Sequence, residues 1–308
     1  MREKAKEPFR WLPGRGYDPA ALCRLRQRFP RPREPLSEAW FLAGAPPRDD
    51  SDDGWMSYWE VRDALYDVAS NPMQAGARDW FHFLLAQEIP GALFGSILPP
   101  LVEALATGLF VFHPLGEESE PYEGFIRDCL DTLGATIMGR DGWSPRGEIK
   151  RGAILRRRWG LGAGWEWRRP AGDLSASMFL CLKYLPRREI APWLHSALHI
   201  RDPFWRGQLL AWFVGAREIL DGSIGYPAEL PLTGRPSVCW SDSNLVTCAA
   251  APFAPQENRR AALDAVAAFF EDMPFSEWTR DVYDDKELAA DLGPLPSRFR
   301  ELFLRVPA

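Results

Sequence analysis

The sequence predicts a mainly α-helical protein, built either from irregular helical hairpins of the HEAT-like solenoid type or as a helical bundle. Three observations support this fold class. Apolar residues recur at steps of three and four in several segments, capping residues and 28 prolines mark sharp element ends, and the composition, 46% hydrophobic and 26% charged, is that of an ordinary globular protein. A chain of 308 residues can bury a large core, so stability needs no disulfide or metal.

The first part of the chain, residues 1–47, is predicted to be a basic, proline-rich arm. Its first 35 residues hold ten lysines and arginines against four acidic residues, a net charge of +6, and are followed by further prolines. We expect a mobile arm with one short helix between Asp18 and Arg28, the alternative being a solvated tail that packs loosely on the main body. Residues 48–308 are then expected to form a single helical domain.

The helical domain is predicted to begin with three helices. Val61, Leu65 and Val68 have the spacing of an amphipathic helix. Asn71 is a suitable N-cap for the next helix, with Pro72 at its first position. The expected ranges are 55–70, 71–87 and 91–110.

The apolar stretch at 89–112 is about as long as a membrane span, which needs roughly 20 residues. It is interrupted by Pro90, Pro99, Pro100 and Glu103. We therefore expect a buried pair of helices with a break at the prolines, and no membrane span.

More helices are predicted in the middle and C-terminal parts. Asp173 and Asp202 stand at N-cap positions, and Pro203 follows Asp202 as Pro72 follows Asn71. This resemblance between two helix starts is the one hint of repeated hairpins, since no regular period of a solenoid is visible. The expected ranges are 122–138, 174–185, 187–199, 203–220, 256–270, 275–282 and 297–304.

Two stretches do not have helical spacing. Residues 139–170 are rich in glycine and are predicted to be an insertion with a small β-hairpin near 147–169. Residues 221–255 contain five prolines and are predicted to be a long surface loop.

The predicted hairpin carries the most unusual stretch of the chain, RRRWGLGAGWEWRR at 156–169. Residues 146–169 hold eight basic and two acidic residues, so a net charge of +6 is concentrated in a chain of net charge −5. Arginine can stack on indole rings and bind carboxylates or phosphates. We predict a partner-binding strip formed by Arg156, Arg157, Arg158, Trp165, Trp167, Arg168 and Arg169.

An acidic run near residue 50 resembles a calcium-binding loop. Asp49, Ser51, Asp53 and Glu60 match positions one, three, five and twelve of an EF-hand. The preceding prolines leave no room for an entering helix, and no paired loop is present. We expect an acidic turn without tight calcium binding, and the sequence leaves calcium binding open.

His195 and His199 lie four residues apart on a predicted helix, a spacing that suits zinc. The sequence HSALH lacks both a glutamate base and a third ligand, so we expect two partly buried packing histidines. The five cysteines are widely spaced, which indicates free thiols in a reducing cytoplasm. No catalytic residue, metal ligand or cofactor is predicted.

Taken together, these features predict a cytoplasmic, tryptophan-rich helical protein that binds a macromolecular partner, most simply another protein. Immunity and antitoxin proteins are examples of this class. The alternative is a nucleic-acid-associated protein that uses the Arg/Trp strip, and a metal-dependent hydrolase ranks third. No catalytic constellation is found in the sequence, which makes an enzyme the less favoured interpretation. The sequence does not determine the identity of the partner or the oligomeric state.

Overall fold

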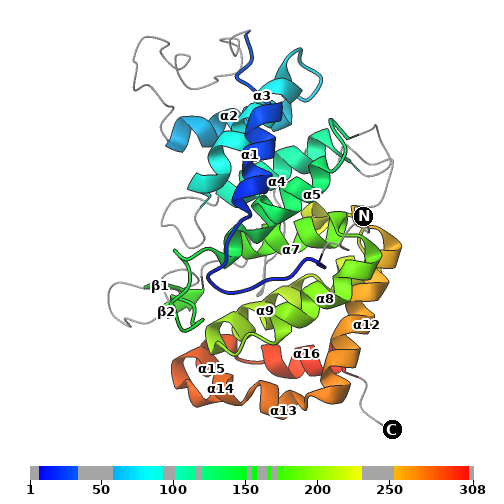
Figure 1. Ribbon diagram of the computed structural model, residues 1–308. Coiled ribbons are helices and arrows are strands. Elements are labelled where there is room, and N and C mark those ends of the chain that lie inside the picture. The colour runs from blue at the N-terminus through cyan, green and yellow to red at the C-terminus, as the bar shows by residue number, and fades with distance from the viewer. Residues whose placement is uncertain are drawn as a thin grey trace, which may run out of the picture.

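The computed structural model describes residues 7–33, 58–92, 101–114, 120–150, 155–157, 165–167, 173–230 and 253–304. The protein is mainly helical, which confirms the predicted fold class (Figure 1). The α-helices are α1 (Pro19–Arg28), α2 (Tyr58–Ser70), α3 (Ala77–Glu88), α4 (Leu101–Phe112), α5 (Phe125–Asp131), α7 (Asp173–Tyr184), α8 (Arg187–Leu198), α9 (Pro203–Gly215), α10 (Arg217–Asp221), α12 (Gln256–Asp272), α13 (Phe275–Trp278), α14 (Arg280–Asp284), α15 (Lys286–Leu292) and α16 (Leu295–Phe303). Three short 3-10 helices are η2 (Ile89–Gly91), η3 (Leu133–Met138) and η4 (Pro227–Glu229).

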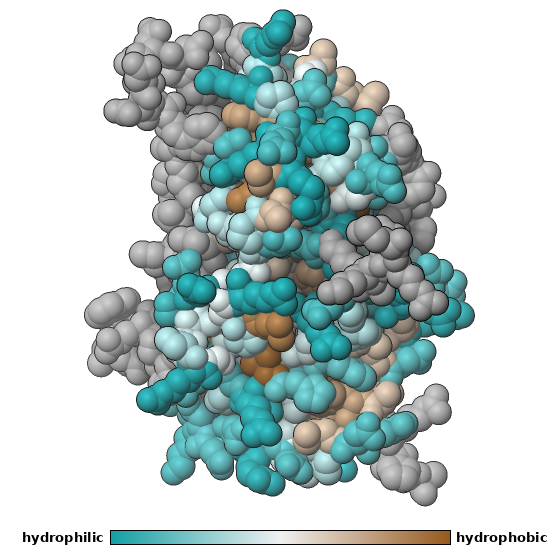
Figure 2. All heavy atoms as spheres, in the orientation of Figure 1, coloured by the Kyte–Doolittle hydropathy of each residue, from teal (hydrophilic) through white to brown (hydrophobic). Residues whose placement is uncertain are grey.

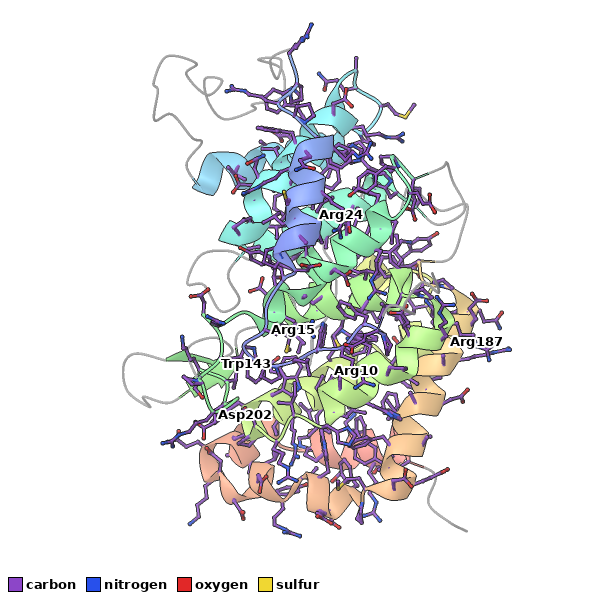
Figure 3. The ribbon with its side chains drawn as sticks, viewed as in Figure 1. Arg10, Arg15, Arg24, Trp143, Arg187 and Asp202 are labelled. Atoms are coloured by element: carbon purple, nitrogen blue, oxygen red, sulfur yellow. The ribbon has the colours of Figure 1, made fainter. Side chains whose placement is uncertain are left out.

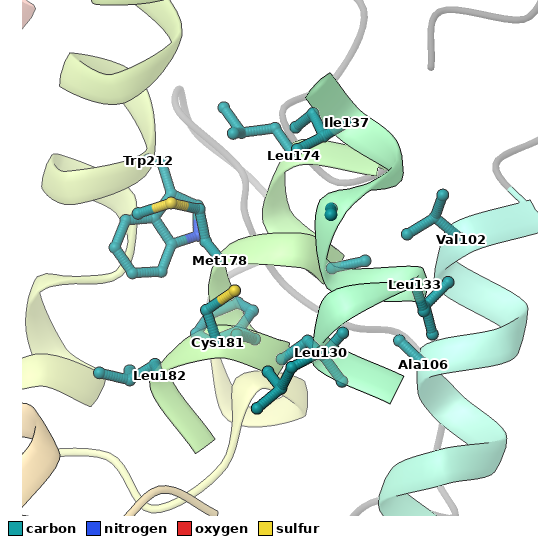
Figure 4. Close-up of a cluster of buried hydrophobic side chains, with 14 of the residues drawn as sticks. Val102, Ala106, Leu130, Leu133, Ile137, Leu174, Met178, Cys181, Leu182 and Trp212 are labelled. Carbon is teal, nitrogen blue, oxygen red and sulfur yellow. The ribbon is translucent and has the colours of Figure 1, made fainter. Parts of the chain in front are cut away.

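Helices α4, α7 and α9 form the centre of the core, because they are apolar on nearly every side and are buried along most of their length. Figure 4 shows how side chains from different elements meet there, with Val102 of α4, Leu133 of η3, Met178 of α7 and Trp212 of α9 among them. Every tryptophan whose side chain the structure describes is buried.

Helices distant in the sequence pack against each other. Helix α2 lies on α4, α8 on α12, and α9 on α16. Helices α1 to α5 gather at one end of the molecule and α8 with α12 to α16 at the other, with α7 between them (Figure 1). In a solenoid each repeat contacts only its sequence neighbours, so this pairing is closer to the bundle alternative. Within the described residues, no helix is both long enough and apolar enough to cross a membrane.

Two of the predicted helix starts are found in the structure, and a third is not. Asp18 caps α1 and Asp202 caps α9, each through a side-chain oxygen that accepts a backbone N–H bond. Asn71 does not start a helix, because its amide donates to the carbonyl of Asp67 in the preceding turn, and α3 begins only after Gly76, which has a φ of 78°. The apparent repeat of the two helix starts is therefore not found in the structure.

The predicted arm needs a correction. Residues 7–18, which we call the strap, cross the middle of the molecule ahead of α1 (dark blue in Figure 1). Phe9 and Trp11 are buried in the core, and Trp11 has no exposed surface. The expectation of a mobile or loosely packed arm is wrong for residues 7–33, because two large aromatic side chains supply enough buried area to fix it. The short helix expected there is present as α1.

The predicted insertion and loop are described only in part. Strands β1 (Leu155–Arg157) and β2 (Trp165–Trp167) pair antiparallel, with Arg156 opposite Glu166. Most of the other residues predicted for the hairpin lie outside the described residues, as do residues 231–252 of the loop predicted at 221–255. The first part of the insertion forms a turn closed by a bridge between Trp143 and Ile149.

Candidate partner-binding groove

The strap is fixed to helix α8 by backbone hydrogen bonds. The N–H of Phe9 donates to Oε2 of Glu189 at 2.8 Å, and the N–H of Trp11 donates to Oγ of Ser196 at 2.9 Å. The indole Nε1 of Trp11 donates to the carbonyl of Gly134 at 2.9 Å. Its ring meets that of Trp193 edge-on, with the centroids 5.3 Å apart. The strap is thus a rigid part of the surface.

A wide groove lies beside the strap. Its volume is about 1330 Å³, which exceeds the roughly 300–1,000 Å³ that is usual for small-molecule sites. Three segments far apart in the sequence line it. They are strap residues 10–13, turn residues 146–149, and residues 191–204, which run from α8 through the link into α9.

Asp202 holds two of these walls together. Its Oδ1 accepts the N–H of Trp205 at 2.9 Å, which caps α9, and its Oδ2 accepts the N–H of Ile149 at 3.0 Å, which fixes the turn. Burial raises the pKa of this carboxyl group, although the backbone hydrogen bonds oppose the shift. Arg10 and Asp202, labelled in Figure 3, mark two sides of the groove.

The rim of the groove is basic. Arg10, Arg146 and Arg201 are exposed, and no ion pair joins any of them to another residue in the described part of the chain. Glu148 is the exposed acidic residue of the lining, so the net charge there is positive. Unpaired arginines around one depression favour an anionic ligand.

Apolar groups are also exposed along the groove. Leu12 of the strap is 41% exposed, and Pro13, Pro192 and Pro203 are partly exposed. Figure 2 shows an apolar patch near the middle of this face, surrounded by hydrophilic residues. The groove therefore offers both apolar and cationic contacts to one ligand.

His195 of α8 and His199, the C-cap residue of α8, lie in the groove wall. His195 is half-buried and its Nε2 is 3.1 Å from the carbonyl oxygen of Ala265. His199 is exposed and its Nδ1 is 2.7 Å from the carbonyl oxygen of His195. Ser196, between them, donates to the carbonyl of Trp193 and accepts from the strap, so it is not an activated nucleophile.

The residues of the predicted Arg/Trp strip are placed only in part. Arg156 and Arg157 lie on β1 and Trp165 and Trp167 on β2, but their side chains lie outside the described residues. Arg158, Arg168 and Arg169 are not described, nor are three of the residues of the calcium-like loop, Asp49, Ser51 and Asp53. Glu60 lies on α2, again without a described side chain. The strip and the loop stay predictions.

The groove itself was missed by the sequence reasoning. One signal for it is visible in the strap once the structure is known. Its residues alternate between buried and exposed positions, as expected of an extended segment lying on a core; the buried ones are Phe9 and Trp11, and the exposed ones are Arg10 and Leu12. The meeting of the three segments that line the groove depends on tertiary contacts, such as that of Asp202 with Ile149, which leave no local pattern.

Comparison with protein-family models, with curated proteins and with solved structures found no match for this chain. Its function must therefore be inferred from the geometry of its surface. Among the described residues, no group of three or more His, Cys, Asp and Glu side chains could hold a metal ion.

Proposed function

We propose that this protein binds a partner protein and holds an acidic, partly apolar segment of that partner in the groove beside the strap. The observation that carries the proposal is that three exposed arginines, none of them ion-paired among the described residues, line an open, partly apolar groove. Three exposed cations raise the local concentration of an anionic ligand, and the apolar surface contributes binding energy when it is covered.

A partner segment fits this groove better than a small molecule does. The groove is open and about 1330 Å³ in volume, and its lining comes from three separate segments, so a compact ligand would leave much of it uncovered. The walls are preformed, because the strap and the turn are hydrogen-bonded to α8 and to Asp202. A preformed site loses little conformational entropy when a ligand binds.

A displayed library of random peptides, selected on the full chain, tests this proposal. We expect the selected peptides to combine Asp or Glu with apolar residues. The triple variant Arg10→Glu, Arg146→Glu, Arg201→Glu should weaken their binding by about tenfold or more, since each like-charge contact is unfavourable. The matched control is Arg187→Glu, Arg260→Glu, Arg280→Glu, which reverses three exposed arginines outside the groove and should change little.

Two results would contradict the proposal. One is equal peptide binding by the triple variant and its control. The other is a stronger affinity for single-stranded RNA or DNA that falls steeply with salt and is lost in the triple variant, which would favour the nucleic-acid alternative.

A further inference from the structure

The geometry of α8 points to a metal site that the proposed function does not use. We infer that His195 and His199 form a two-histidine site for a borderline divalent cation such as Zn²⁺. The two residues are four apart at the C-terminal end of α8, and residues four apart lie on the same face of a helix. Both rings also pack near one aromatic ring, with their centroids 6.0 Å and 5.0 Å from that of Phe269.

The hydrogen bonds of the two rings fix which nitrogen atoms are free. A carbonyl oxygen can only accept, so Nε2 of His195, next to the carbonyl of Ala265, carries the hydrogen atom. In the neutral ring its Nδ1 then keeps a lone pair. By the same reasoning, Nδ1 of His199 donates to the carbonyl of His195, and its Nε2 keeps the lone pair.

This arrangement is typical of histidine ligands. A metal-binding imidazole usually donates its other N–H to a carbonyl or carboxylate, which fixes the tautomer and the orientation of the ring. Neither free nitrogen has a hydrogen-bond partner among the described residues. Both residues line the groove, so a cation from solution can reach them.

The site supplies two ligands, and the described residues supply no third. Zn²⁺ usually binds four ligands, so water or an added anion would occupy the other positions. The arginines that line the groove oppose a divalent cation, but they are exposed, and charges exposed to water interact weakly. They also favour an anionic co-ligand, such as a carboxylate. The sequence argued against metal here because HSALH offers no third ligand, whereas the inference rests on the orientation of the two rings by backbone carbonyls, which the sequence does not reveal.

A titration of the full chain with Zn²⁺ tests the site. We expect saturable binding by calorimetry, together with a rise in melting temperature, because a ligand that binds the folded state stabilises it. His195→Gln and His199→Gln should each weaken the affinity by about tenfold or more, and the double variant should abolish binding. Cys23→Ser, which removes an exposed thiol elsewhere, should leave binding unchanged.

The site would be refuted by the absence of saturable binding at millimolar Zn²⁺, or by binding that survives in the double variant. Folding of the variants is checked by circular dichroism, and His199 is exposed, so its replacement should not disturb the core. If peptides bind the groove but Zn²⁺ does not, this inference fails while the proposed function stands. If Zn²⁺ binds and the peptides do not, the proposed function fails while this inference stands.

Discussion

The imidazole of His82 lies among aromatic rings and is only 4% exposed. Its ring packs on that of Phe29, with the centroids 4.4 Å apart, and its Nε2 is 2.7 Å from Nε2 of His113. One of these two nitrogen atoms must donate and the other accept, so the bond can form between two neutral rings. Burial lowers the pKa of His82 to about 3, with smaller contributions from the charges of His113 and Arg78.

The low pKa predicts how stability depends on pH. In the unfolded chain His82 takes up a proton near its ordinary pKa of 6.5, whereas in the folded protein it stays neutral down to about 3. Acid therefore favours the unfolded state, and His82 alone should remove about 2 kcal/mol of stability by pH 5. We expect His82→Gln to lack this loss of stability in acid. His199→Gln, which changes an exposed histidine, is the control and should still show it. Urea denaturation from pH 7.5 down to pH 5 measures the difference, and parallel curves for all three proteins would contradict it.

At the scale of whole elements, the close approach of α3 and α4 depends on Gly108. A Cβ atom built at Gly108 would overlap the ring of Phe81, which is itself fully buried. Overpacking of a filled core costs about 1–3 kcal/mol, while alanine in a helix gains up to about 1 kcal/mol over glycine. We expect Gly108→Ala to destabilise the protein in chemical denaturation. Gly91→Ala, where the added atom meets only ordinary contacts, is the control and should be nearly neutral.

The sequence predicted elements well where a local pattern defines them. Asp18 and Asp202 act as caps, and the apolar spacing in α2, α8 and α12 matches their buried faces. Short elements were missed: α15, with seven residues, is too short to show a helical period, although Asp285 caps it by accepting from Leu288. The prediction that Asn71 starts a helix was wrong, because its side chain donates a hydrogen bond back to the preceding helix. The local sequence does not determine whether such a side chain bonds to the helix before it or to the one after it.

The candidate site was harder to predict than the helices. The sequence draws attention to concentrated charge, and so to the Arg/Trp strip. The arginines of the groove are single residues far apart in the chain, and only the packing of the strap on α8 and of the turn on Asp202 brings Arg10 and Arg146 to one groove. Tertiary contacts of this kind leave no periodic pattern, so a reading of one sequence cannot find them.

At the scale of the molecule, the strap links the two ends of the fold. It bonds to the first end where the N–H of Gly16 donates to Met138 and that of Asp18 donates to Asp131. It bonds to the second end through α8, and Trp11 lies between the two. The ring of Trp11 packs on Trp193 and Trp205 while its N–H reaches Gly134 of η3. Trp11 therefore belongs to both halves of the core.

This position predicts that Trp11→Ala destabilises the whole molecule and does not merely release the strap. Truncation of a buried tryptophan costs about 3–5 kcal/mol, and the loss should shift the entire unfolding curve. Trp11→Phe keeps an aromatic ring but loses the hydrogen bond to Gly134, so we expect a smaller shift. Denaturation followed in parallel by circular dichroism and by fluorescence measures both variants. An unchanged midpoint, with faster proteolysis confined to residues 7–18, would show instead that the strap detaches alone and that the two ends hold together without it.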